Sequence, residues 1–112
     1  MASKDSNKYK KVEGLLRLYP EINYRKEVAL QFQRLGEDRS KELIELEAKK
    51  KIVENMLEGL KDRSEEDYRL IKMWYFEKRS RTYIALELNM CEKTVWWRRR
   101  KIINEYLMSF VK

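Results

Sequence analysis

Apolar residues recur three and four positions apart along almost the whole chain, which is the spacing of one buried face of an α-helix. This spacing predicts helices over about residues 7–18, 20–35, 41–60 and 64–76, followed by two more toward the C-terminus. Gly36 stands where the second helix should end, because glycine readily adopts the left-handed conformation that closes a helix. No stretch alternates apolar and polar residues between turn residues as a strand does. The sequence therefore predicts an all-α fold.

Local signals at the helix ends add to this prediction. Pro20 disfavours helix in the residue before it and should separate the first helix from the second. The apolar spacing of the second helix turns five side chains inward: Ile22, Val28, Ala29, Phe32 and Leu35. Ser64 to Asp67 has the form of a capping box, in which Ser64 caps the helix N-terminus and Asp67 reaches back.

The stretch Ser80–Lys101 has the outline of a helix-turn-helix. A short apolar helix pattern runs to Leu88, a three-residue break follows, and a long helix then carries a block of basic residues. Ala85 is small where the two helices must cross closely, Asn89 tolerates the left-handed conformation of a turn, and Val95 anchors the second helix on the first. In units of this kind the second helix enters a DNA groove.

The second helix of this unit has two different faces when it is read at about 100° per residue. The apolar face should pack inward and holds Val95, Ile102, Ile103, Tyr106, Phe110 and the stem of Arg99. The opposite face holds Thr94, Trp97, Arg98, Lys101 and Asn104, with Lys93 and Arg100 at its flanks. It therefore offers cations for phosphate and hydrogen-bonding groups for base edges.

Three residues of this unit depart from the simplest pattern. Trp97 is a large aromatic on a solvated face, which indicates that DNA or a partner covers it; alternatively, Trp96 and Trp97 both pack against the preceding helices. Arg98 stands where many helix-turn-helix units have an apolar residue, so its side chain is expected to reach solvent or phosphate. Cys91 occupies a position where Ser or Thr is the usual N-cap, so this cap should be weak.

The formal net charge of +7 is concentrated in the second half of the chain. Residues 61–112 carry 13 basic and 8 acidic side chains, whereas residues 1–60 carry 13 and 11. No acidic residue occurs between Lys93 and Asn104. A positive stripe along one helix is expected of a nucleic-acid binder, although a helical protein with a generally basic surface has similar totals.

The composition argues against an enzyme, a metal site and a membrane protein. There is no histidine and Cys91 is the one cysteine, so no internal disulfide, Cys/His metal cluster or Ser–His–Asp set can be built. The three glycines form no phosphate-binding loop. No run of about 18 apolar residues and no apolar signal core is present. We therefore expect a cytoplasmic protein without catalytic residues, metal or cofactor.

Four stretches match a known pattern: Ser64–Asp67, Tyr75–Glu77, Ile84–Leu88 and Glu92–Val95. Through them, residues 64–110 resemble the fourth region of bacterial sigma factors, which reads the upstream promoter element. The whole chain, including Val12–Pro20, is similar to the small phage-encoded transcriptional regulators of the ArpU type. The resemblance implies control of phage or prophage late genes at the nucleoid of a bacterial host. It also implies four groove-facing residues: Lys93, Thr94, Trp97 and Arg98.

The first functional hypothesis is a DNA-binding transcriptional regulator with two parts. Residues 61–112 would form the helix-turn-helix domain and insert residues 92–104 into the major groove, while the N-terminal helices of residues 1–60 would make a homodimer or contact RNA polymerase. Phosphate or guanine would be contacted by Arg98, Arg100 and Lys101. Thr94 and Trp97 would meet a base edge or a thymine methyl group. The DNA backbone would be held by Arg79 and Arg81.

The second hypothesis is a protein-interaction module, for example a small terminase-like oligomer in phage packaging. Residues 40–60 would then form an intermolecular helical bundle. Salt distinguishes the two hypotheses, because DNA affinity falls steeply with salt while apolar helix packing does not.

Overall fold

The computed structural model describes residues 3–111, and within that range it is built from helices and contains no strand. The α-helices are α1 (Ser3–Leu18), α2 (Ile22–Arg34), α3 (Ser40–Arg63), α4 (Glu65–Ile71), α5 (Arg81–Leu88) and α6 (Glu92–Glu105). Short helical turns of other types cover Tyr19–Glu21, Lys72–Phe76 and Leu107–Phe110. The all-α prediction is confirmed. None of these helices is both long enough and apolar enough to span a lipid bilayer.

The helix ends follow the local signals in the sequence, with one exception. Pro20 lies in the 3₁₀ turn that separates α1 from α2, and Gly36 has a φ of +94°, as a glycine that closes a helix should. Ser64 caps α4, because its hydroxyl accepts a hydrogen bond of 3.2 Å from the Asp67 N–H. The prediction that the Asp67 side chain reaches back is wrong. Its carboxylate instead accepts a hydrogen bond from Arg98 of α6.

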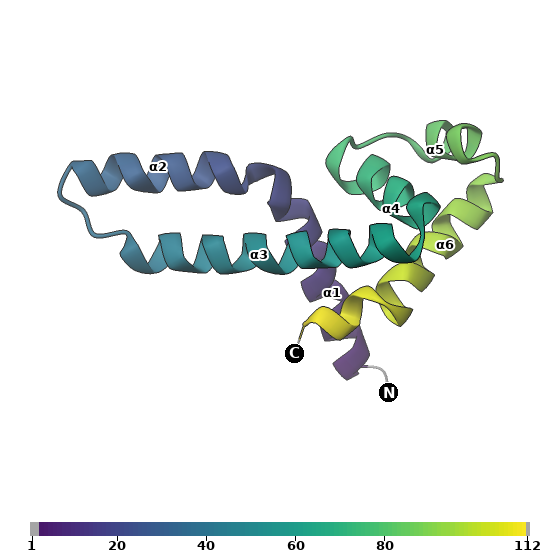
Figure 1. Cartoon of the computed structure of the whole chain (residues 1–112), viewed down its shortest axis with the longest axis horizontal. Coiled ribbons are helices and arrows are strands. Elements are labelled where there is room, and N and C mark those ends of the chain that lie inside the picture. Colours follow the sequence, from purple (N-terminus) through teal and green to yellow (C-terminus); the bar gives the residue numbers. More distant parts are fainter. Residues whose placement is uncertain (1–2, 112) are drawn as a thin grey trace.

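The chain forms a helical cluster with a long hairpin projecting from it. Figure 1 shows α2 and α3 running antiparallel, away from the end of α3 where α1, α4, α5 and α6 gather. The main core lies in that cluster and takes side chains from each of these helices: Leu16, Met56, Leu70, Ile84 and Ile103. The division expected at residue 60 is therefore not a boundary in the packing, because α1 and the end of α3 share one core with residues 61–112.

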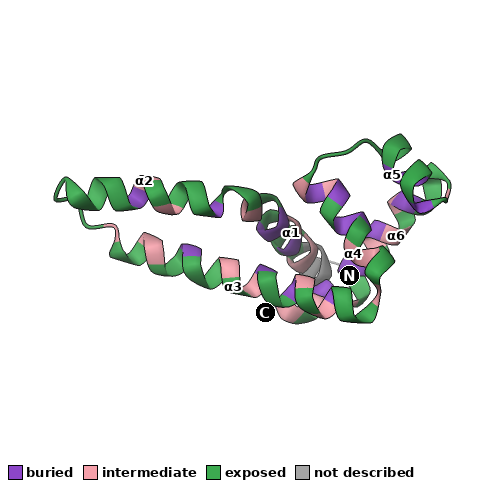
Figure 2. Cartoon of the chain, turned by 45° about the horizontal axis from the view of Figure 1, so that its top comes forward, coloured by how far each residue is buried: buried purple, intermediate pink, exposed green. Residues whose placement is uncertain are grey.

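The α2–α3 hairpin is only two helices thick, and this limits what it can bury. Ile22 and Ala29 of α2 and Leu46 of α3 are buried along it, whereas most of its surface is exposed (Figure 2). The prediction that Val28, Phe32 and Leu35 point inward is wrong: Val28 is only half-buried, Phe32 is exposed and Leu35 is 82% exposed. A single neighbouring helix covers only one stripe of a helix surface. With α3 on one side, a second apolar stripe on α2 stays open to solvent.

Gly59 in α3 leaves room for the hydroxyl group of Tyr106. A Cβ atom at this position would lie 2.2 Å from the Tyr106 hydroxyl oxygen. We expect Gly59→Ala to lower the free energy of unfolding by about 1–2 kcal/mol, because the added methyl group overpacks this contact. In a Tyr106→Phe background the same substitution should raise the free energy of unfolding, since alanine favours helix over glycine by about 1 kcal/mol. Urea unfolding of the four proteins measures both effects, and stabilisation by alanine in both backgrounds would contradict the contact.

Candidate nucleic-acid interface

A tight turn joins α5 to α6 and sets the angle between them. Asn89 ends α5 in the left-handed conformation, with φ 55° and ψ 51°, as predicted from its residue type. Ser80 caps α5 by accepting a hydrogen bond of 3.1 Å from the Tyr83 N–H. Val95 of α6 is fully buried in the same core cluster as Ile84 of α5, so the expected apolar anchor between the two helices is present.

The two faces of α6 lie as the sequence predicts, with the exception of Arg98. The inner face is buried and consists of Val95, Arg99, Ile102 and Ile103. The outer face of α6 is exposed and consists of Lys93, Thr94, Trp97, Lys101 and Asn104. These five residues contribute to the lining of an open hollow of about 530 Å³. The outer face therefore presents two cations, two hydrogen-bonding side chains and one indole ring to solvent.

The two tryptophans of α6 have different environments. Trp97 is 58% exposed, which contradicts the alternative that it packs against the preceding helices. Trp96 is half-buried, and its ring meets that of Trp97 edge-on at a centroid distance of 5.2 Å. Trp96 thus supports the ring of Trp97 from the side while the rest of that ring stays accessible. An exposed indole held in place in this way is suited to pack against a ligand surface.

Arg98 does not point freely to solvent as the sequence reading expected. Its Nε donates to Asp67 at 2.9 Å, and its Nη2 lies 3.1 Å from Glu66. Both carboxylates belong to the first turn of α4, so Arg98 clamps α6 to α4. Contact with a phosphate would require this side chain to leave two acidic partners. The assignment of Arg98 to the DNA-contacting set is therefore not supported by its position.

Arg100 is likewise held by the protein itself. Its guanidinium lies over the ring of Tyr9 at 5.2 Å and over the ring of Trp96 at 4.9 Å. The side chain is half-buried between α1 and α6. Such stacking stabilises a cation beside an aromatic ring and fixes its direction. Of the three cations assigned to phosphate or guanine, Lys101 alone is both exposed and on the outer face.

The two arginines near the start of α5 are exposed. Arg79 stacks on Tyr83 at 4.5 Å, and its Nε donates to Glu77 at 3.3 Å. Arg81 is the first residue of α5. Both lie beside a helix N-terminus, where backbone dipoles favour an anion. This position suits the backbone-holding role expected of them.

The N-terminus of α6 has a weak cap. Cys91 is the N-cap residue, and its side chain makes no capping hydrogen bond to the backbone. Its sulfur instead lies 3.0 Å from the hydroxyl oxygen of Thr94. This hydrogen bond to Thr94 is the main reason that the pKa of the Cys91 thiol is lowered from its usual value. The first-turn N–H groups of α6 therefore lack a side-chain acceptor from their N-cap.

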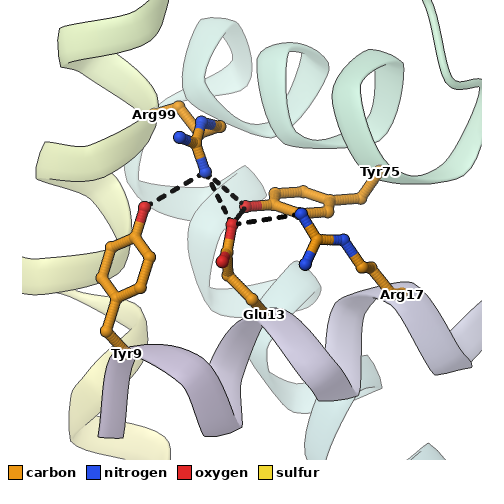
Figure 3. Close-up of polar contacts among 5 residues, drawn as sticks. All are labelled: Tyr9, Glu13, Arg17, Tyr75 and Arg99. Atoms are coloured by element: carbon orange, nitrogen blue, oxygen red, sulfur yellow. Dashed lines mark hydrogen bonds and ion pairs between the residues drawn. The ribbon is translucent and has the colours of Figure 1, made fainter. Parts of the chain in front are cut away.

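A buried polar cluster on the inner face of α6 holds this helix in position, and the sequence analysis did not predict it. Figure 3 shows Arg99 of α6 surrounded by Tyr9 and Glu13 of α1 and by Tyr75. One terminal nitrogen of Arg99 donates to the Glu13 carboxylate at 2.7 Å, to the Tyr75 hydroxyl at 2.8 Å and to the Tyr9 hydroxyl at 3.1 Å. The Tyr75 hydroxyl in turn donates to Glu13.

The environment of this cluster keeps the hydroxyl group of Tyr75 protonated. Arg99 is 7% exposed, and its guanidinium lies 4.5 Å from the ring of Trp74. Burial, together with the hydrogen bond to Glu13, raises the pKa of the Tyr75 hydroxyl far above its ordinary value, so this group remains a donor at neutral pH. The one sign of this cluster in the sequence is that the stem of Arg99 falls on the apolar face of its helix, because a buried guanidinium needs an acidic or hydrogen-bonding partner.

Comparison of the chain with protein-family models, with curated proteins and with solved structures gave no match. Among the side chains of residues 7–111, no group of three or more His, Cys, Asp or Glu residues is arranged to hold a metal ion.

Proposed function

We propose that the protein binds double-stranded DNA through the outer face of α6 and regulates transcription. The observation that carries this proposal is the exposure of Lys93, Trp97 and Lys101 on one face of a helix whose opposite face is buried in the core. An α-helix of this kind fits the major groove, and α5 with its turn supports it as the first helix of a helix-turn-helix. The resemblance to sigma region 4 and ArpU-type regulators supports a role in phage or prophage late-gene control.

The chemistry of the outer face suggests how the contacts would divide. Lys93 and Lys101 would bind phosphates or guanine, while Thr94 and Asn104 would hydrogen-bond base edges. The Trp97 ring would pack on a thymine methyl group or on the sugar–phosphate backbone. Arg79 and Arg81 would hold the backbone of the flanking DNA. In this revised assignment Arg98 and Arg100 position α6 and do not contact DNA.

Selection of bound duplexes from a random DNA pool, with the purified chain near physiological salt, tests this proposal. We expect an enriched motif and an affinity that falls steeply as salt rises, since each phosphate contact releases a counterion. A two-fold-symmetric motif would indicate a dimer, and a short asymmetric motif would indicate a sigma-like role beside RNA polymerase. If no duplex is enriched and binding at low salt is absent, the proposal is wrong for the isolated chain.

Cys91 provides an independent test of where DNA lies, because it is exposed and lines the same hollow as the outer face of α6. It is the one cysteine of the chain, so a thiol reagent modifies one defined position. We expect saturating duplex to slow alkylation of Cys91 by about tenfold, since a thiol covered by DNA is inaccessible. The rate is measured by mass spectrometry with and without the selected duplex. An unchanged rate at saturation would show that DNA binds elsewhere.

A second candidate function, protein interaction, is supported by the exposed apolar side chains of the hairpin. Tyr24, Leu35 and Ile44 are each at least 70% exposed. Apolar side chains of this size on a slender hairpin are typical of a contact surface. This function is compatible with DNA binding, because the hairpin and the outer face of α6 belong to different parts of the molecule (Figure 1).

A further inference from the structure

Helix α2 and its C-cap residue Leu35 carry a stripe of uncharged side chains on the side that faces away from α3. We call Tyr24, Val28, Gln31 and Leu35 the α2 seam. Tyr24 is 72% exposed and Leu35 is 82% exposed, while Gln31 is exposed and Val28 is half-buried. Counted at about 100° per residue, the four lie within about 60° of one another and roughly opposite the buried Ile22. No charged residue of α2 falls within that sector.

The spacing of the α2 seam is that of a helix that packs on another helix. Its members are separated by four, three and four residues, which is the alternation of the a and d positions of a heptad. Ile22 and Ala29, which pack toward α3, belong to a different stripe of the same helix. Helix α2 therefore has two packing faces, and α3 covers one of them.

The charges beside the α2 seam indicate what covers the other face. Val28 and Leu35 take the a positions of this spacing. Glu27 and Arg34 each directly precede one of them, so both lie on the same flank of the seam. Among the side chains that the structure describes, those of residues 7–111, neither has a partner in an ion pair. When two copies of α2 pack antiparallel, this flank of one helix faces the same flank of the other. Glu27 then approaches the partner's Arg34, and by symmetry Arg34 approaches the partner's Glu27. A parallel pair would instead place Phe32 opposite Glu27.

We propose that the α2 seam pairs with the α2 seam of a second copy of this chain, in antiparallel orientation. Tyr24 would face the partner's Leu35, and Val28 would face the partner's Gln31. This arrangement puts the two helical clusters at opposite ends of the paired hairpins, where they do not collide. The proposal does not depend on DNA binding. A seam of four layers is short, so we expect a dissociation constant on the order of 10 µM.

Analytical ultracentrifugation across 1–300 µM tests for this dimer. The unmodified chain should sediment as a monomer–dimer equilibrium, and the Tyr24→Glu/Leu35→Glu variant should remain monomeric throughout. Both side chains are strongly exposed, so the variant should keep its helical circular dichroism. Ile44→Glu is the matched control, because Ile44 is 70% exposed on the hairpin but lies about 160° around α3 from the buried Leu46. A monomeric unmodified chain, or a dimer lost equally in Ile44→Glu, would overturn the proposal.

Charge exchange tests the flank contacts. Glu27→Arg and Arg34→Glu should each weaken the dimer about fivefold, since each creates two like-charge contacts at the surface. The double exchange Glu27→Arg/Arg34→Glu should restore the original affinity. Failure of the double variant to recover, after both single changes weaken the dimer, would overturn the antiparallel register.

Disulfide trapping tests the orientation directly. In a Cys91→Ser background, Tyr24→Cys chains mixed with Leu35→Cys chains should form a mixed disulfide, because these positions face each other across the antiparallel seam. Tyr24→Cys chains alone should not, since the two Tyr24 positions would lie about 16 Å apart along the helices. Covalent dimers of Tyr24→Cys alone would show a parallel pair and refute the proposed arrangement.

Discussion

Replacing Glu13 by alanine should lower the free energy of unfolding by about 3 kcal/mol, because it leaves the Arg99 guanidinium buried without its carboxylate partner. Arg99 is 7% exposed, and Glu13 is the acidic group that its guanidinium contacts at 2.7 Å. The hydroxyl groups of Tyr9 and Tyr75 remain as acceptors but carry no charge. Urea unfolding followed by circular dichroism measures the loss. The midpoint of the unfolding curve should fall to a lower urea concentration, while the dependence of the free energy on urea stays unchanged.

Two further variants distinguish the effect of losing the buried Glu13–Arg99 pair from the effect of losing a surface charge. Arg17 is the other cation near Glu13; its side chain is 63% exposed, and its guanidinium lies 3.6 Å from the Glu13 carboxylate. Arg17→Ala should therefore change the free energy of unfolding by less than about 0.5 kcal/mol. The double variant Glu13→Leu/Arg99→Met replaces both buried charges by apolar groups and should recover much of the loss. A Glu13→Ala protein as stable as the original would contradict the cluster.

Replacing Lys93 and Lys101 by glutamine should weaken duplex binding about 100-fold at about 0.1 M salt and reduce the salt slope by about 2, since each lysine accounts for one released counterion. Both side chains are exposed on the outer face of α6. Fluorescence anisotropy with the selected duplex, repeated over a salt series, gives affinity and slope together. A large loss of affinity at an unchanged slope would indicate that the lysines act through folding and not through phosphate.

Matched variants sharpen this experiment. Lys41→Gln/Lys51→Gln removes the same charge from exposed positions on the hairpin and should leave the affinity within about threefold. Arg98→Gln should behave differently from both, because Arg98 is paired with Asp67 and Glu66. We expect it to lower stability by about 1 kcal/mol while the salt slope stays unchanged.

Helix periodicity and end signals were sufficient to predict much of the fold from the sequence. The all-α class, the left-handed Asn89 and the anchoring role of Val95 depend on residue type and spacing, and the structure contains all three. The partners of the Arg98 and Arg100 side chains could not be predicted from residue type and spacing. A long arginine side chain reaches whichever partner the tertiary fold brings near, and here those partners come from α4 and α1, distant in sequence.

The errors on α2 have a related cause. Apolar spacing identifies every stripe that can be buried, but not which stripes find a neighbour within the same chain. Leu35 satisfies the spacing and is nevertheless 82% exposed. The proposed pairing of two α2 helices would account for this by placing its neighbour in a second molecule.

The buried cluster around Arg99 also affects how the protein folds. Its hydrogen bonds join residues 86 and 90 positions apart in the chain, so closing them requires nearly the whole sequence to be present. Helices and the α2–α3 hairpin form from local contacts and are fast, whereas such distant contacts are slow because loop closure restricts the chain before any bond compensates. We therefore expect α6 to be the last helix fixed in place, so that the outer face of α6 becomes rigid only when α1 has docked.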